Sequence, residues 1–197
     1  NVNDEAETST TMPTQAGTYK VVIEVVGDDN WNAFTYGTNG EITFTIAKAE
    51  VTVPTLSETE YVYNKDVQKP TVGECSVAFT YVYANAESTN KGTYGVTLTI
   101  TDGRNYVWAG ETSNVITLTY EIKQAPNAIT NFAIEGWTYN EAGTSNDPTA
   151  TANFGTPSFT YYTSEADAQN NANGTTAKPV NAGTYWVVAS VEGTDNY

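Results

Sequence analysis

The 197-residue chain contains no histidine and a single cysteine, Cys75. The lack of histidine excludes Ser-His-Asp and Cys-His catalytic arrangements and zinc sites built on imidazole. One cysteine cannot form a disulfide within the chain. Because small secreted animal domains are usually rich in disulfides, this composition favours an exported bacterial protein.

Basic residues are also scarce: eight Lys and Arg stand against 23 Asp and Glu, and the net charge is −15. Binding to phosphate groups needs clustered basic residues, so we predict that neither nucleic acid nor an anionic membrane is a partner. The chain also lacks an apolar run of the roughly 18–20 residues that a membrane-spanning helix requires, which predicts no direct membrane insertion. Residues 1–13 are polar and acidic, unlike a signal peptide, so any targeting or anchoring segment is expected outside this sequence.

Signatures of enzymes are missing as well. The chain has no P-loop and no Gly-x-Gly-x-x-Gly that precedes a helix. Carboxylate pairs could serve a glycosidase, but small repeat units leave little room for the cleft it needs. We therefore predict a protein that is not an enzyme and has no cofactor. Calcium is the alternative, but no D-x-D-x-D-G motif is present and the acidic residues shift between copies, as turn residues do. The candidate calcium ligands are Asp28, Asp29, Asp102 and Asp195.

What the chain does contain is one pattern in three copies, at 16–31, 91–106 and 182–197. In each copy a Gly-Thr-Tyr is followed, twelve residues after the tyrosine, by Trp or Tyr, and an asparagine precedes that aromatic residue. Such self-similarity indicates a tandem-repeat protein. The motif residues, to which we assign a structural role, are Gly17, Tyr19, Trp31, Gly92, Tyr94, Tyr106, Gly183, Tyr185 and Tyr197.

The residues after each Gly-Thr-Tyr alternate in polarity, which predicts a strand with one buried face. The predicted buried faces are Tyr19, Val21, Ile23 and Val25; Tyr94, Val96, Leu98 and Ile100; and Tyr185, Val187, Ala189 and Val191. The polar stretches that follow, GDDN, TDGRN and EGTDN, predict turns. In the first two copies a second alternating strand comes next, EITFTIAKA and VITLTYEIKQA.

Positions 76 residues apart, such as Phe44 and Tyr120, match one another and extend the repeat. We predict three segments: 1–48 holds the closing strands of an incomplete unit, 49–124 is a complete unit, and 125–197 is a unit without its last strand. Short strands separated by turn signals, without a convincing long helix, predict an all-β fold of small sandwich units. A β-grasp-like repeat is the alternative. A polar insertion in the third unit predicts one short helical turn after Ser164.

The [AK]-G-T-Y-x-V strand, the x-N-[WY] turn and the closing FTI or YEI strand together resemble the immunoglobulin-like tandem repeats of bacterial cell-surface proteins, of MBG or Big type. The resemblance implies an immunoglobulin-like β-sandwich and an extracellular stalk that carries an adhesin at the bacterial surface. Some members bind host glycans or host proteins. Tyr19, Tyr94 and Tyr185 resemble the tyrosine of the immunoglobulin tyrosine corner, whose hydroxyl bonds to nearby backbone, and the resemblance therefore implies a structural role for them.

Four tryptophans raise the question of sugar binding, since aromatic rings stack on sugar faces. Trp31 and Trp137 align with tyrosines of other copies and are expected in the core. Trp108 lies just beyond a turn, and Trp186 lies on the strand face opposite Tyr185. Trp108 and Trp186 are the candidates for exposed ligand contacts, but we favour burial at a junction between units over sugar binding for both.

A Lys–Asn isopeptide crosslink is a further feature of some stalk domains of Gram-positive bacteria. Lys48 lies near a strand end and is the candidate. Its equivalent in the next unit is Gln124, so such a crosslink would not repeat. A solvated lysine at a junction between units is the simpler interpretation.

Three hypotheses for function follow. The first is a non-enzymatic stalk or spacer of an adhesin on the bacterial cell surface. The second is a binding module for a host glycan or protein. The third is a filament subunit whose incomplete ends are paired by strand addition between neighbouring copies. The simplest account of the incomplete end units is that the sequence is an excerpt of a longer tandem array.

Overall fold

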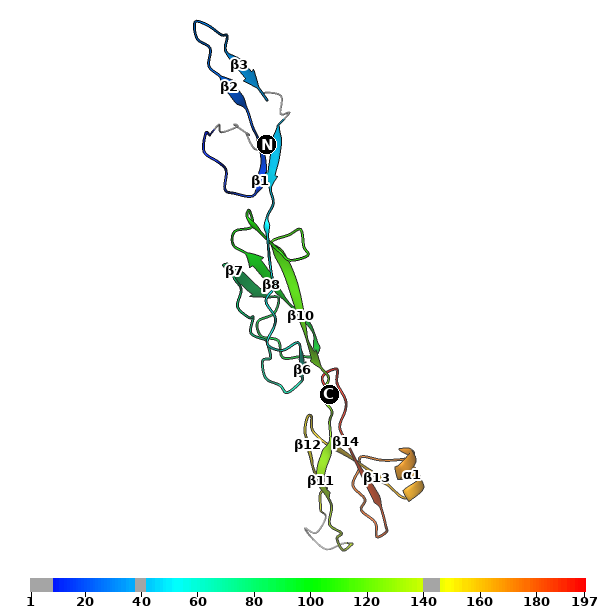
Figure 1. Cartoon of the computed structure of the whole chain (residues 1–197). Coiled ribbons are helices and arrows are strands. Elements are labelled where there is room, and N and C mark those ends of the chain that lie inside the picture. Colours follow the sequence, from blue (N-terminus) through cyan, green and yellow to red (C-terminus); the bar gives the residue numbers. More distant parts are fainter. Residues whose placement is uncertain (1–8, 38–41, 140–145) are drawn as a thin grey trace. The chain divides into compact units, whose positions relative to one another are not determined.

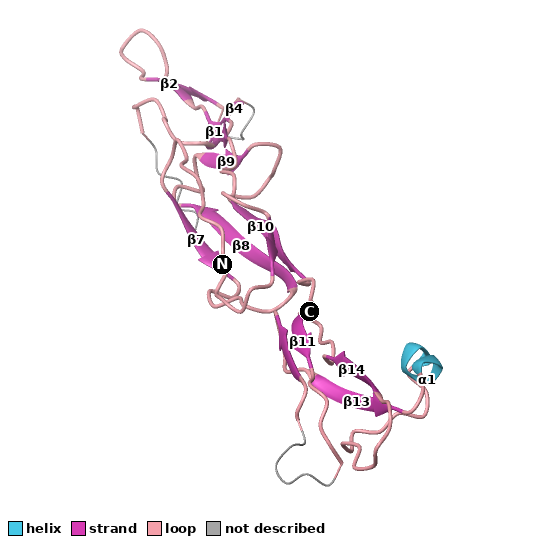
Figure 2. Cartoon of the chain, turned by 90° about the horizontal axis from the view of Figure 1, so that it is seen from below, coloured by secondary structure: helices cyan, strands magenta, loops and turns pink. Residues whose placement is uncertain are grey.

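The computed structural model describes residues 9–37, 42–139 and 146–197. These residues are mostly β-strand, with one short helix, so the predicted all-β class is confirmed (Figure 1). Figure 2 shows that helix, α1, in cyan among the strands. Contacts divide the chain into two compact units, 1–59 with 69–88 and 93–120, and 60–68 with 89–92 and 121–197. No helix in the described ranges is long and apolar enough to cross a membrane.

The first unit contains short paired strands and most of a larger sheet. Its antiparallel pairs are β1 (Gly17–Lys20) with β4 (Thr43–Ile46), β2 (Ile23–Val25) with β3 (Phe34–Tyr36), and β7 (Phe79–Tyr83) with β8 (Gly92–Ile100). β5 (Ala49–Val51) runs parallel to β9 (Tyr106–Trp108). β10 (Val115–Lys123) lies beside β8 in the sheet.

The second unit begins where β10 ends. β6 (Glu60–Val62) runs parallel to the last three residues of β10, and Lys123 Nζ lies 2.6 Å from Glu60 Oε1. Two antiparallel pairs follow along the chain. They are β11 (Ile129–Ala133) with β12 (Thr149–Ala152), and β13 (Ser158–Tyr162) with β14 (Trp186–Ser190).

Strand β8 confirms the predicted alternation in the second copy. Val96, Leu98 and Ile100 are almost fully buried, whereas Thr97 and Thr99 on the other face are only half-buried. Burying each such aliphatic side chain contributes about 1.5–3 kcal/mol. The hydrophobic residues of this strand therefore form the centre of the first unit's core.

The first copy does not follow the same prediction. Its strand is interrupted between β1 and β2, and Ile23 and Val25, expected on a buried face, are 50% and 45% exposed. In the described residues β2 pairs only with β3, and a two-stranded hairpin has no second layer to cover its apolar face. The alternation of polar and apolar residues identified these strands. It carries no information on whether a second layer of the fold covers their apolar face.

The predicted helical turn is confirmed as α1 (Glu165–Asn170). Ser164 is its N-cap: the Ser164 hydroxyl accepts a hydrogen bond from the Asp167 N–H and donates one to the Asp167 carboxylate. The hydrogen bond from Ser164, followed by one from Asn173, lowers the pKa of Asp167. At the other end Asn171 adopts the left-handed conformation, which ends the helix.

The tryptophans are not distributed as predicted. Trp108 is fully buried and packs edge-to-face on Phe79, which rules it out as the exposed ligand contact for which it was a candidate. The reason is tertiary: β9 pairs in parallel with β5 and buries both Val107 and Trp108. Trp31, expected in the core, is 57% exposed instead. Trp186 is half-buried, and its position on β14 lies opposite the buried Tyr162 on β13.

We expect Trp108→Ala to lower the free energy of unfolding by roughly 3–5 kcal/mol, because it leaves a large cavity in the core. Trp108→Phe is the matched control. Since the Trp108 Nε1–H is buried without a hydrogen-bond partner among the described residues, losing it should offset part of the lost packing. Urea denaturation followed by circular dichroism measures both variants. A Trp108→Ala protein as stable as the parent would contradict the core assignment.

Candidate functional site

The turns that end the second and third copies of the repeat each contact the copy before. In the second copy, Asn105 Oδ1 accepts a hydrogen bond from the Ala16 N–H at 2.7 Å, and Asn105 Nδ2 donates one to the Gln15 side chain. The Asn105 carbonyl accepts a third, from the Ala49 N–H at 2.8 Å. Asn105 thereby holds both the segment before the first Gly-Thr-Tyr and the start of β5.

The third copy repeats this arrangement with Asn196. Its Oδ1 accepts from the Lys91 N–H at 2.8 Å, and its Nδ2 donates to Asn90 Oδ1 at 3.1 Å. Its carbonyl accepts from the Ala125 N–H at 2.8 Å. We call each such set of hydrogen bonds an asparagine clamp. Each clamp lies within one compact unit.

A fourth hydrogen bond completes each clamp, although the donor residue changes. Lys48 Nζ donates to the Gly103 carbonyl at 2.6 Å, and Gln124 Nε2 donates to the Thr194 carbonyl at 3.1 Å. The acceptor precedes the clamp asparagine by two residues in both cases. Lys48 and Gln124 therefore have the same role, and the structure gives Lys48 a main-chain carbonyl as its partner.

Acidic residues shape the turns that present the asparagines. Asp102 accepts from the Asn105 N–H at 3.2 Å and from Asn105 Nδ2 at 2.8 Å, and the side-chain hydrogen bond is the main reason why the pKa of Asp102 is lowered. Asp28 accepts from the Asn30 and Trp31 N–H groups. In the third copy the Thr194 hydroxyl accepts from the Asn196 N–H. Among the described residues no cluster of three or more His, Cys, Asp or Glu side chains could hold a metal ion.

The tyrosines of the motif brace the segments that the clamps hold. The Tyr19 hydroxyl donates to the Gln15 carbonyl at 2.7 Å, and the Tyr185 hydroxyl donates to the Asn181 carbonyl at 3.2 Å. This is the bond to nearby backbone that the tyrosine-corner analogy implies. The motif glycine lies under the ring, since a Cβ at Gly183 would be 3.3 Å from the ring of Tyr185. A larger residue there would crowd that ring.

Sequence analysis singled out the aromatic residues and glycines of the motif and noted the asparagines only as a pattern. The turns place the three aromatic residues differently: Trp31 is exposed, whereas Tyr106 and Tyr197 are half-buried. Tyr197 stacks on Phe154, with ring centroids 5.3 Å apart. The recurrence of asparagine before each aromatic residue was the signal for the clamp. The distant partners of the asparagine side chains, 89 to 106 residues away, could not be read from that signal.

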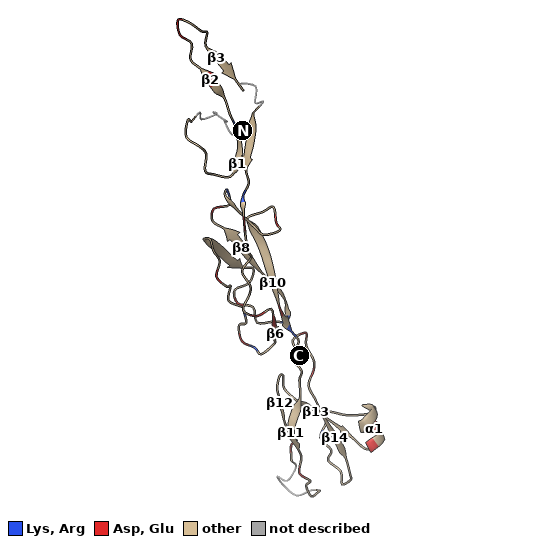
Figure 3. Cartoon of the chain, in the orientation of Figure 1, with Lys and Arg blue, Asp and Glu red and all other residues tan. Residues whose placement is uncertain are grey.

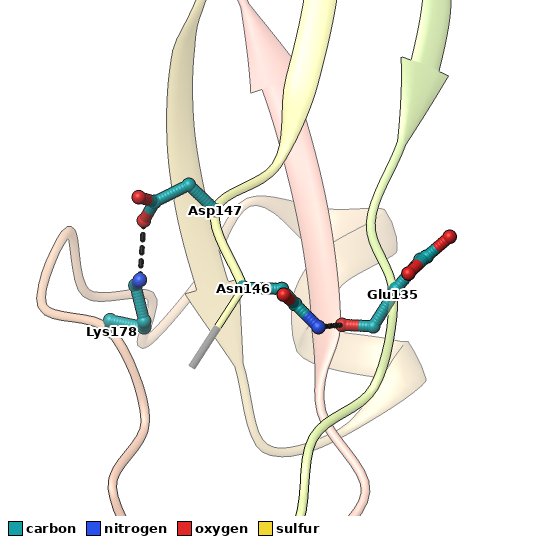
Figure 4. A network of polar contacts seen from close by, with 4 residues as sticks. All are labelled: Glu135, Asn146, Asp147 and Lys178. Carbon is teal, nitrogen blue, oxygen red and sulfur yellow. Dashed lines mark hydrogen bonds and ion pairs between the residues drawn. The ribbon is translucent and has the colours of Figure 1, made fainter. Parts of the chain in front are cut away.

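A cavity of about 340 Å³ lies in the second unit. The residues that line it include Ile134, Trp137, Tyr161, Tyr185 and Val187. Figure 4 shows the polar contacts of Glu135, which is also one of the residues that line the cavity, together with Asn146, Asp147 and Lys178. Asn146 Nδ2 donates to the carbonyls of Glu135 and Gly136, and Lys178 pairs with Asp147.

The charged side chains within residues 9–37, 42–139 and 146–197 do not gather at one place. Figure 3 shows acidic residues scattered along the chain, mostly between strands, with some on β-strands and α1. Comparisons of the chain with protein families, with curated proteins and with solved structures found no match.

We expect Asn105→Ala to loosen the first clamp, because it removes the side-chain hydrogen bonds to Ala16 and Gln15, each worth about 0.5–1.5 kcal/mol. Hydrogen exchange measured by mass spectrometry should speed up at residues 15–20 and stay unchanged at residues 90–95. Asn30→Ala is the matched control, since no described residue bonds the Asn30 side chain. Equal effects of the two substitutions would show that the clamp contributes nothing.

The two clamps should also differ in their response to acid. Because the folded-state pKa of Asp102 is lowered, its contribution is present above the ordinary carboxyl value of about 3.9 and is lost as pH falls through the lower folded value. The Asn196 clamp has the Thr194 hydroxyl instead and should not respond in this way. NMR titration of the two asparagine side-chain amides tests this. A shared titration midpoint would contradict it.

Proposed function

We propose that this chain is a non-enzymatic segment of tandem immunoglobulin-like repeats from an exported bacterial surface protein, where it acts as a stalk or spacer of an adhesin. The observation that carries the proposal is the asparagine clamp, because the same kind of four-bond arrangement connects two successive pairs of motif copies. A repeated connection between copies is what a chain needs if it gains reach by adding repeats. The enzymatic alternative has no comparable support from the described residues.

Each repeat is proposed to be a small immunoglobulin-like sandwich. The sheet β6-β10-β8-β7 supplies most of the strands, and the separate pair β5–β9 carries the buried Trp108. A β-grasp-like unit is the alternative. Sequence segments 49–124 and 125–197 are proposed as two units of this kind, with segment 1–48 as part of another.

The binding-module alternative now depends on Trp186 alone, since Trp108 is in the core. A half-buried ring offers less stacking surface to a sugar than an exposed one. Host glycan or host protein therefore stays a secondary proposal. The low content of basic residues argues against nucleic acid as a partner.

Small-angle X-ray scattering on the whole chain tests the spacer proposal. A compact protein of this length has a radius of gyration of about 16 Å. We expect a clearly larger value, and a further change when Asn105 and Asn196 are both replaced by Ala, because the clamps order the junctions. The Asn30→Ala variant should match the parent. A radius of gyration near the compact value would contradict a spacer.

A further inference from the structure

We propose that the outer edge of β7 accepts an extended segment of another polypeptide by antiparallel strand pairing. The segment that fits places a β-branched residue opposite Tyr81, has glycine directly before it, and carries basic rather than acidic side chains. The proposal rests on the contacts of β7 and of its counterpart β13, and it holds whether or not the chain is a spacer.

β7 is the outermost strand of the four-stranded sheet, whose order is β6-β10-β8-β7 (Figure 2). In the described ranges neither a strand nor an isolated bridge lies on its other side. Both β7 and its neighbour β8 lie far from either end of the sequence. The pairing of this edge is therefore a property of residues well inside the chain.

The main chain of β7 presents hydrogen-bonding groups along this edge. The Ala78 carbonyl and the Ala84 N–H both bond to the β8 segment, at 3.0 and 2.9 Å. In an antiparallel pair, alternate residues direct their main-chain groups to the neighbouring strand. Phe79 and Tyr81 lie at the intervening positions, so their N–H and C=O groups point away from β8. No described residue bonds these groups.

The side chains at this edge add apolar surface. The ring of Tyr81 packs between Phe79 and Tyr83, with centroids 6.1 and 5.8 Å away, so one face of β7 carries a row of aromatic rings. Tyr81 is nevertheless 46% exposed, and Val82 on the other face is 68% exposed. A strand added beside β7 would cover apolar surface on both faces.

β13 shows how an edge of this kind is occupied. It shares the sequence Phe-Thr-Tyr with β7 and pairs antiparallel with β14, the strand that corresponds to β8. On its outer side the Tyr161 N–H donates to the Thr175 carbonyl at 2.8 Å, and the Thr175 N–H donates to the Tyr161 carbonyl at 3.0 Å. The polar insertion of the third copy therefore supplies an extended segment to this edge. The second copy has no such insertion.

The same insertion indicates which side chains fit. Thr175 is β-branched, which suits a paired strand. Gly174 precedes it, and a Cβ at Gly174 would lie 2.5 Å from the side chains of Thr160 and Tyr162. Thr80 stands in β7 where Thr160 stands in β13, relative to the shared tyrosine. Glycine followed by a β-branched residue is therefore the order that fits β7 as well.

Charge distinguishes another polypeptide from a second copy of this chain. Each copy carries a net charge of −15, so two copies repel one another as they approach. A basic segment is attracted instead. Recognition of this kind combines main-chain pairing at a sheet edge with selection of alternate side chains. The partner is therefore an extended segment that contains Lys or Arg beside the glycine and β-branched pair.

The test titrates the peptide ANGTTAK, the sequence of residues 172–178 with both ends capped, into the whole 197-residue chain. The peptide contains one lysine and no acidic residue. NMR should show amide shifts at residues 79–83 and none at residues 158–162, because the chain's own insertion already occupies the edge of β13. Shifts elsewhere, or none up to millimolar peptide, would overturn the proposal.

Two methylated peptides test the main-chain pairing without altering the fold of the chain. N-methylation at the residue that corresponds to Thr175 should weaken binding roughly tenfold, because it removes the donor to the Tyr81 carbonyl. N-methylation at the next threonine is the matched control, since alternate N–H groups point away from the edge. Equal weakening by the two modifications would exclude strand pairing.

A third peptide tests the preference for a basic partner. Lys178→Glu in the peptide should weaken binding, and the difference should shrink as salt is added, because salt screens the charge of the chain. Equal binding of the two peptides at low salt would overturn that preference. Shifts at residues 79–83 that appear when the chain alone is concentrated would also overturn the proposal, because the edge would then belong to a second copy.

Discussion

The side-chain amide of asparagine is the group on which the contacts between successive copies of the sequence motif depend. It offers an acceptor oxygen and a donor nitrogen a short distance apart, so one side chain can bond two neighbouring groups of another segment. Asn105 and Asn196 use both atoms in this way and add their main-chain carbonyls. Aspartate could accept but not donate, and leucine could do neither. The recurring asparagine therefore has a chemical reason beyond turn formation.

The two clamps differ in residue type but keep the same hydrogen bonds. Lys48 and Gln124 differ in charge, yet each donates to the carbonyl two residues before the clamp asparagine. Asp102 and Thr194 likewise differ in charge, yet each accepts the main-chain N–H of its asparagine. The hydrogen bond is retained while the residue type varies. At these solvent-exposed contacts a charged residue and an uncharged one can serve equally, because the charged side chain does not have to be buried.

The hydrogen bonds of the clamps contribute only modestly to the free energy of unfolding. Most of its hydrogen bonds are exposed, and exposed hydrogen bonds contribute modestly because water competes for both partners. The larger contribution comes from apolar burial inside the units, as on β8. Order at the junctions and stability of the cores thus have separate physical origins.

Several features followed from the sequence by itself. Period-two patterning predicted the β class and the buried face of β8, and the polar insertion predicted α1 with Ser164 at its start. These predictions succeed because strand alternation and helix capping depend on residues close together in the chain. The spacing of the motif also marked the asparagine turns as equivalent positions.

Only the tertiary structure decided the rest. Trp108 is buried and Trp31 is exposed because burial depends on which distant strands lie above a residue, and no local pattern carries that information. The partners of Asn105 and Asn196 lie far along the sequence, so their hydrogen bonds appear only when the chain folds. Local chemistry determined the elements, and long-range pairing determined which of their surfaces meet.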